Sequence, residues 1–173
     1  MTLLELMVTL VIVAIVMALG VPSYKYVTTN NRMASEVNGL LGDLQFARGE
    51  AIKEGQTVTL CSSSDGATCN GLANKWNNGW IVFSDPNNNQ TVDTSETVYR
   101  VQRAFLGSDT FAADNSATAV TFNREGFASV APTAVTPVTI TLKDSTSNPL
   151  WTRCVAIQTV GMLVTQKHGT GNC

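Results

Sequence analysis

The sequence predicts an α+β fold, in which a long, kinked N-terminal helix packs on a β-rich globular head of antiparallel sheets. Between residues 6 and 21 the only polar side chain is Thr9. From residue 24 to residue 54 apolar side chains recur in steps of three and four, which is the period of an amphipathic helix. After Gly55 the apolar pattern changes to period two, which is typical of strands. The chain has 173 residues, enough for one domain and a long helix.

Residues 1–23 form the first predicted unit, a transmembrane or assembly half of the helix. Glu5 lies at the edge of the apolar stretch, and no Lys or Arg precedes Lys25. An ionised carboxylate is costly in a bilayer, so an unpaired one here indicates a function. A signal peptide would begin with a positively charged region, and an ordinary anchor would usually be flanked by Lys or Arg. Pro22 has no backbone N–H, so we expect a kink near Gly20–Pro22.

Residues 24–55 form the second predicted unit, an amphipathic half of the same helix. The stripe expected to face the head consists of Val37, Leu40, Leu41, Leu44, Ala47, Ala51 and Ile52. Gly55 follows the last periodic residue and suits a helix C-terminus. A helix of about fifty residues would be roughly 80 Å long, so only its second half can pack on a head of this size. The first half must be buried in lipid or in other subunits.

Residues 56–173 form the predicted head. Candidate strands are Gln56–Cys61, Gly79–Ser84, Thr97–Ala104, Ala117–Asn123, Phe127–Val130, Val138–Lys143, Arg153–Gln158 and Met162–Gln166. Turn-rich segments separate them at Asn74–Asn78, Asp85–Asp93, Gly107–Ser116 and Ser145–Pro149. Several short strands after one long helix favour an antiparallel sheet domain packed on that helix.

Four cysteines, Cys61, Cys69, Cys154 and Cys173, allow three disulfide pairings. We favour Cys61–Cys69 with Cys154–Cys173, because the residues between the first pair resemble a single turn. Two disulfides would place the head in the periplasm or outside the cell. Zinc binding is disfavoured, because the sequence has no C-x-x-C and its one histidine, His168, is distant in sequence from the first cysteine pair.

The N-terminus resembles that of a type IV pilin or a type II secretion pseudopilin. The residues that carry the resemblance are Met1, Thr2, Leu3, Leu4, Glu5, Leu6 and Pro22. The resemblance implies that Met1 is the first residue after cleavage by a prepilin peptidase and that its amino group is methylated. It also implies that Glu5 pairs with the α-ammonium of Met1 on a neighbouring subunit during assembly. Such a pair would be desolvated, so an unpaired partner would be penalised heavily.

Further motifs are similar to the FimT/FimU/GspH branch of this family, and they cover nearly the whole chain. They are a helix end at 48–53, a Trp-Asn-Asn-Gly-Trp strand at 76–85, a strand at 96–100 and a hairpin at 120–126. The resemblance implies a minor pilin or minor pseudopilin, held by one helix in the inner membrane with its head in the periplasm and later built into a filament. Its implied partners are other major and minor pilins, and the role that we favour is assembly or priming of a pilus.

DNA binding is an alternative role, because some FimT-type pilins bind DNA through a C-terminal Gly-Arg-x-Arg stretch. The corresponding region here, Gly161–Val164, contains no Arg. The nearby cations are Arg153, Lys167 and His168, which are scattered where phosphate contacts need clustered Lys or Arg. Charged residues make up 14% of the chain and the net charge is −2, which also argues against a strongly basic nucleic-acid binder.

The segment 85–96 has the ligand spacing of a calcium-binding EF-hand loop. Asp85, Asn87, Asn89, Asp93 and Glu96 fall at loop positions 1, 3, 5, 9 and 12. Position 6 is Gln90 where the motif has Gly, and strands flank the loop in place of helices. The favoured interpretation is a β-hairpin loop in which Asn and Asp make local turns, with Ca²⁺ as the less favoured alternative.

The sequence contains no recognisable catalytic constellation. It has a single histidine, no Gly-x-Ser-x-Gly and no phosphate-binding loop. We therefore predict a protein that is not an enzyme and, calcium aside, takes no cofactor.

Overall fold

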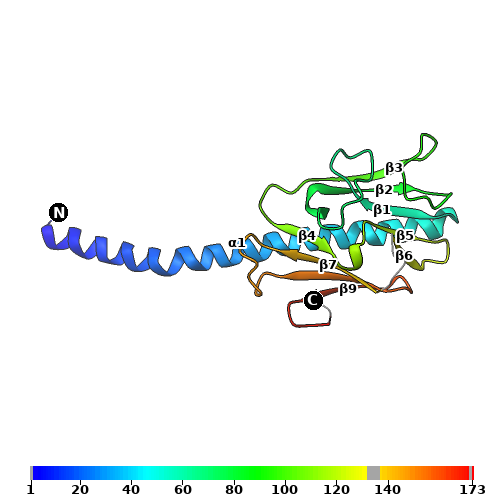
Figure 1. The fold of residues 1–173 in the computed structure, drawn as a ribbon. Coiled ribbons are helices and arrows are strands. Elements are labelled where there is room, and N and C mark those ends of the chain that lie inside the picture. The colour runs from blue at the N-terminus through cyan, green and yellow to red at the C-terminus, as the bar shows by residue number, and fades with distance from the viewer. Residues whose placement is uncertain (1, 132–136, 172) are drawn as a thin grey trace.

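The computed structural model describes residues 2–131, 137–171 and 173. One helix, α1 (Leu3–Glu54), runs from the N-terminal end of the molecule into the head (Figure 1). It begins with a capping box, in which the Thr2 and Glu5 side chains each accept the other residue's backbone N–H. It ends at Gly55, whose φ of 69° is the left-handed conformation that glycine adopts at low cost.

The two halves of α1 have opposite surroundings, as the sequence pattern predicts. Every described residue up to position 28 is exposed, whereas Met33, Val37, Leu40, Leu44, Ala47 and Ala51 are buried. The helix is unbroken through Pro22 and bows gently (Figure 1). The predicted stripe is wrong at Ile52, which is 51% exposed because it lies at the edge of the buried face whereas its neighbour Ala51 faces the core, and Leu41 is only partly buried. Met33 extends the buried stripe by one turn toward the N-terminus.

The head consists of two antiparallel sheets. The five-stranded sheet has the order β3-β2-β1-β5-β6, from β1 (Val58–Ser62), β2 (Gly79–Ser84), β3 (Val98–Arg103), β5 (Ala119–Phe122) and β6 (Ala128–Ala131). The four-stranded sheet has the order β4-β7-β8-β9, from β4 (Thr110–Ala113), β7 (Val138–Lys143), β8 (Arg153–Ile157) and β9 (Leu163–Lys167). Two short 3-10 helices, η1 (Trp76–Asn78) and η2 (Asp114–Ser116), lie in the connections.

The prediction that Gly107–Ser116 contains only turns is wrong, because β4 lies inside it. β4 is short and pairs along one side only, with β7 in the register Thr110↔Lys143 to Ala113↔Ile140. Of its four residues only Phe111 is buried, so the segment has too little apolar alternation to be recognised as a strand. What fixes it is the long-range pairing with β7, which local sequence does not reveal.

The second half of α1 shares one hydrophobic core with both sheets (Figure 1). Trp76 and Trp80 are fully buried in this core, and the Trp76 indole N–H donates to the Ala117 carbonyl at 3.1 Å. A second, smaller core lies on the other face of the five-stranded sheet, around Cys61, Ile81 and Phe83. Successive residues of β2 are therefore buried on both faces, which explains why Trp80 and Phe83 are both core residues although they point to opposite sides.

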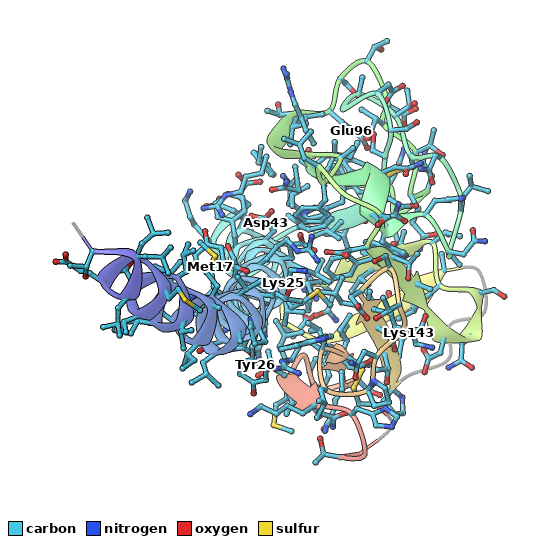
Figure 2. The ribbon with its side chains drawn as sticks, turned by 90° about the vertical axis from the view of Figure 1, so that its left-hand side faces the viewer. Met17, Lys25, Tyr26, Asp43, Glu96 and Lys143 are labelled. Carbon is cyan, nitrogen blue, oxygen red and sulfur yellow. A yellow bond between two sulfur atoms is a disulfide. The ribbon has the colours of Figure 1, made fainter. Side chains whose placement is uncertain are left out.

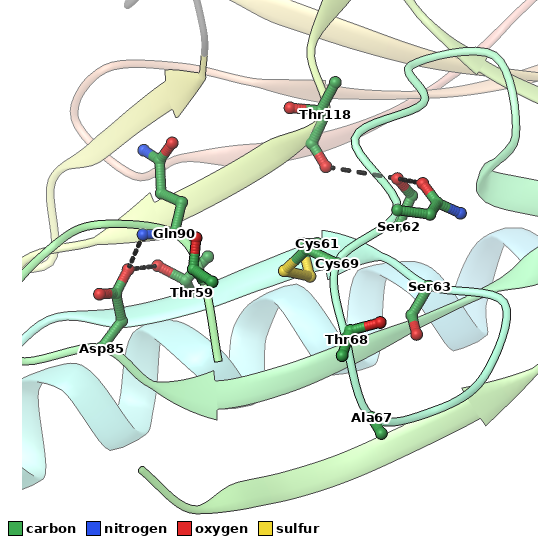
Figure 3. Close-up of a disulfide and its surroundings, with 12 residues drawn as sticks. Thr59, Cys61, Ser62, Ser63, Ala67, Thr68, Cys69, Asp85, Gln90 and Thr118 are labelled. Atoms are coloured by element: carbon green, nitrogen blue, oxygen red, sulfur yellow. Dashed lines mark hydrogen bonds between the residues drawn. A yellow bond between two sulfur atoms is a disulfide. The ribbon is translucent and has the colours of Figure 1, made fainter. Parts of the chain in front are cut away.

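Each sheet carries one disulfide, and the pairs are those that the sequence favours. Cys61 in β1 is bonded to Cys69, which fastens the intervening loop beside the five-stranded sheet (Figure 3). Cys154 in β8 is bonded to Cys173, which ties the C-terminal turn to the four-stranded sheet.

Candidate functional site

The first half of α1 is the largest apolar surface that the described part of the chain exposes. Residues such as Leu10, Ile12 and Ile15 are more than half exposed, although an isolated globular domain would bury them. The helix contains an 18-residue window of mean hydropathy 2.7, none of which is buried in the molecule. It is long and apolar enough to cross a membrane by length and composition. This surface needs lipid or other helices as its partner.

Glu5 lies at the start of this surface, at the N-terminus of the helix. The Thr2 backbone N–H donates to Glu5 Oε2 at 3.4 Å, and the Glu5 N–H donates to Thr2 Oγ1 at 3.3 Å. A carboxylate in the first turn also interacts favourably with the helix dipole. Glu5 makes no ion pair with the residues that the structure describes, and Met1, its predicted partner in assembly, lies outside them. The carboxylate is therefore held in position by the cap while its charge is available to a group outside this chain.

Asp43 fixes the orientation of the second half of α1 on the five-stranded sheet. Its carboxylate accepts the Trp80 indole N–H at 2.8 Å and the Arg100 guanidinium at 2.9 Å. The Arg100 guanidinium also lies 3.8 Å from the centre of the Phe46 ring, in a cation–π arrangement. Because the Trp80 side chain is buried, its N–H depends on Asp43 for a partner.

Two further contacts fasten the last turns of α1. Arg48, in the predicted helix-end motif, donates from Nε to the Gly126 carbonyl at 3.0 Å and from Nη2 to the Val160 carbonyl at 3.4 Å. The Tyr99 hydroxyl donates to Glu54 Oε2 at 2.6 Å. Burial, followed by this hydrogen bond and the Glu54 charge, raises the pKa of Tyr99 to about 12. The hydroxyl therefore stays protonated and continues to donate to Glu54 at neutral pH.

Arg32 and Glu36 form a polar cluster with the head at the point where α1 enters it. Arg32 pairs with Asp109 at 3.0 Å, and Asp109 is almost fully buried. Burial, with a smaller contribution from the nearby Asp109, raises the pKa of Glu36 to about 7 against the opposing effect of Arg32. Burial also raises the pKa of Asp109. Sequence periodicity places Arg32, Glu36, Asp43 and Arg48 off the apolar stripe and gives no sign of their contacts with the head.

The predicted calcium loop forms local turns. Asp85 is buried, and its carboxylate accepts Thr59 Oγ1 at 2.6 Å and the backbone N–H groups of Asn89 and Gln90 at 2.9 and 3.1 Å (Figure 3 shows the bonds to Thr59 and Gln90). Asp93 accepts the side-chain amides of Asn87 and Asn89. The Glu96 carboxylate accepts the Asp93 N–H at 2.9 Å.

These loop carboxylates accept hydrogen bonds from the loop itself and, at Asp85, also from Thr59 of β1, as in the β-hairpin interpretation. Among the residues that the structure describes, no three His, Cys, Asp or Glu side chains are placed to hold a metal ion. The arrangement therefore gives the calcium prediction no support.

Of the three cations that the sequence offered for nucleic acid, Arg153 lies on β8, Lys167 ends β9 and His168 lies in the turn that follows. Arg153 is opposite Lys167 in the β8–β9 register. Its guanidinium donates to Asn30 of α1 at 2.9 Å and to the Leu150 and Thr152 carbonyls. Lys167 and His168 are exposed. Arg153 thus binds the head to the helix, and only two cations remain open to a phosphate backbone.

Comparisons with known proteins agree with this architecture. Residues 36–161 match the family described as type II transport protein GspH. Crystal structures of the type IV minor pilin FimU from Pseudomonas aeruginosa (strain PAO1) have a similar fold in two space groups. The P21 structure has a TM-score of 0.57 and 17% identity, over 85% of this chain and 95% of that chain. The P65 structure has a TM-score of 0.54 and 18% identity, over 81% and 94% respectively. No curated protein matches the sequence.

Proposed function

The chain belongs to the GspH family of type II transport proteins, and we propose that it is a minor pilin that primes or enters a type IV pilus. Family and fold together support a minor pilin or pseudopilin. In the proposed role the chain links a tip complex to the major pilin. It thereby supports pilus assembly, twitching motility, adhesion and DNA uptake.

The observation that carries the proposal is the division of α1 into an exposed apolar half and a half fastened to the head. In the proposed cycle, a prepilin peptidase processes the precursor in the inner membrane, and the exposed half holds the chain there with its head in the periplasm. The same surface then packs against the helices of other pilins. Extraction from lipid is offset by burial in the helix bundle, where van der Waals contacts and paired polar groups favour association.

Glu5 supplies the register of this packing in the proposed mechanism. Its carboxylate pairs with the methylated α-ammonium of Met1 on the neighbouring subunit, in surroundings with little water. Attraction between opposite charges is strong there, and a subunit out of register leaves both charges unpaired.

A pseudopilin of a type II secretion system is the second candidate, and the name of the matching family favours it. Its helix would use the same chemistry in a shorter-lived filament. DNA binding by the head is the third, and the commitment of Arg153 to Asn30 weighs against it.

The test exploits the double role of Glu5 in capping and in charge. Glu5→Gln keeps a side chain that can complete the capping box but removes the charge, whereas Glu5→Ala removes both. In a deletion strain of the source organism, the wild-type gene should restore surface pili, twitching and DNA uptake. We expect neither variant to do so, although both should accumulate in the membrane. Glu125→Gln, a surface glutamate of the head, is the matched control and should restore all three.

The three outcomes separate the candidates. Full activity of Glu5→Gln would reject the charge-pairing mechanism. Loss of protein secretion with pili intact would favour the pseudopilin. Loss of DNA uptake alone, with pili intact, would favour the DNA-binding role.

A further inference from the structure

The end of the head from which the free half of α1 emerges carries a group of apolar and aromatic side chains that are exposed or, at Trp151, half-buried. We call this the basal surface and define it by Tyr24, Tyr26, Leu106, Leu150 and Trp151. Leu106 is 101% exposed and Leu150 is 67% exposed, at the tips of two separate loops. Figure 1 shows both loops at this end of the head, and Figure 2 views the molecule from this end, with Tyr26 and Lys25 labelled.

Both leucines are presented by loops that the head holds in place. Phe105 packs on Trp80 and Phe111, with ring centres 5.6 and 5.5 Å apart, while the next residue, Leu106, points away from the core. In the second loop the exposed leucine comes before the aromatic residue that packs on the core. Trp151 packs against the core and against Tyr26, at 4.8 Å between ring centres, and its neighbour Leu150 is exposed. Scattered exposed leucines are ordinary, but two on anchored loops at one end of a molecule require a partner.

The position of this surface along α1 matches the edge of a bilayer. The apolar residues Leu3 to Val21 would span about 28 Å at about 1.5 Å per residue, close to the roughly 30 Å of a hydrocarbon core. Tyr24 and Tyr26 follow about 4 to 8 Å beyond that edge, which is the depth of the headgroup layer. Tyr and Trp are the residues that prefer this layer, because their rings are apolar and their tips are polar.

The charges around the basal surface have one exposed sign. The segments 24–36, 103–110 and 143–153 contain three acids, of which Asp109 and Asp144 are buried and Glu36 is half-buried. The exposed cations of the same segments include Lys25, Arg103 and Lys143, whereas Arg32 pairs with Asp109 and Arg153 donates to Asn30. A face whose carboxylates are buried or half-buried and whose exposed charges are lysines and an arginine is suited to the phosphates of a membrane.

We propose that the basal surface docks on the lipid headgroup layer while α1 spans the membrane, with Leu106 and Leu150 inserted below the phosphates. The proposal rests on the proposed function insofar as it needs α1 in a bilayer. It goes further by assigning the lower face of the head to lipid in the unassembled state. Docking sets the height and tilt of the head before assembly, and it has to be released when the subunit leaves the membrane.

The test uses the full chain in vesicles of phosphatidylcholine and phosphatidylglycerol whose acyl chains carry bromine just below the glycerol. Bromine quenches nearby tryptophan fluorescence, and subtracting the signal of Trp151→Phe isolates Trp151 from the buried Trp76 and Trp80. We expect quenching that depends on Trp151, its loss in the double variant Leu106→Ser/Leu150→Ser, and weaker quenching in vesicles of phosphatidylcholine alone. Val160→Ser/Met162→Ser, an apolar pair that is 55% and 46% exposed beside Arg48 at the far end of α1, is the control and should leave the quenching unchanged.

Flotation of the protein with the vesicles reports insertion of α1 separately. A chain that fails to float would contradict the proposed function. A chain that floats without Trp151-dependent quenching would overturn the docking proposal alone. Docking would also be overturned if the Trp151 signal responded only to protein density and not to lipid bromine, since a second copy would then cover the surface.

Discussion

Glu36 lies on the polar side of α1 in the sequence pattern, but the folded chain buries part of its carboxylate and raises its pKa toward neutral pH. One of its carboxylate oxygens is buried and has no hydrogen-bond partner among the described residues. The periodicity of α1 identifies the face that packs on the head. It does not show that the two sheets reach around the helix far enough to enclose Glu36 and Arg32. The signal is absent from the sequence because Asp109, which faces both residues, is more than seventy positions away.

Glu36 makes the stability of the head depend on pH. Its pKa is raised from 4.5 to about 7 in the folded chain, so the folded state binds more protons than the unfolded state between these values. The free energy of unfolding therefore falls as pH rises from 4.5 through 7. Because Glu36 is only partly buried, solvent screening limits the loss to about 1 kcal/mol.

We expect Glu36→Gln to remove this loss, so that it is more stable than the wild type at pH 8 and similar at pH 4. Urea unfolding of the full chain in detergent, followed by tryptophan fluorescence at several pH values, measures the difference. Glu125→Gln serves as the control. A wild-type curve that does not change between pH 5 and pH 8 would contradict the assignment.

At the scale of elements, the sequence predicts those features that depend on neighbouring residues. The C-terminal end of α1 is predicted by Gly55, and β2 and β7 have their predicted bounds. The other predicted strands differ by one or two residues at one or both ends, because pairing with the next strand decides where each ladder stops. β4 depends entirely on such pairing and was not predicted. The position of the Asp85 carboxylate also depends on a distant strand, because the Thr59 hydroxyl of β1 donates to it.

Pro22 allows the two halves of α1 to be tested separately. Pro22→Ala restores the N–H that can bind the Ala18 carbonyl, so the helix should become straighter and locally more stable. Because residues 2–28 are exposed and the buried stripe begins at Met33, the free energy of unfolding of the head should change by less than about 0.5 kcal/mol. We expect reduced incorporation into filaments, since a straightened helix meets its neighbours along a different path.

The control for this change is Gly20→Ala. A methyl group at Gly20 meets no atom within 4 Å, and it adds helix propensity without adding a hydrogen bond. Filament yield and thermal unfolding of both variants give the comparison. Equal filament yields for Pro22→Ala and the wild type would show that the bend has no part in assembly.

At the scale of the whole molecule, the second half of α1 packs against both sheets of the head, and the first half extends from the head and is exposed (Figure 1). The fold class, the division of the helix and the disulfide pairs could be predicted, because each depends on composition or on short loops. The order of strands could not. β1 lies between β2 and β5, so its neighbours come from segments that are far apart in the sequence. Because both sheets pack on α1, the polar side chains Asp43, Arg48 and Arg32 on different sides of the helix contact different parts of the head.

The two disulfides staple different sheets, so we expect their contributions to stability to be nearly additive. The Cys154–Cys173 loop spans 19 residues and the Cys61–Cys69 loop spans 8. In the chain-entropy account, closing them stabilises the fold by about 3 and about 2.5 kcal/mol respectively. Cys61 and Cys154 are both fully buried, so each double variant should lose some packing as well, and Cys154→Ala/Cys173→Ala should remain the costlier of the two. Urea unfolding of both double variants and of the quadruple variant, in the full chain, measures these costs. If the quadruple variant lost much more unfolding free energy than the two double variants together, the two disulfides would not act independently, and the sheets would stabilise each other through α1.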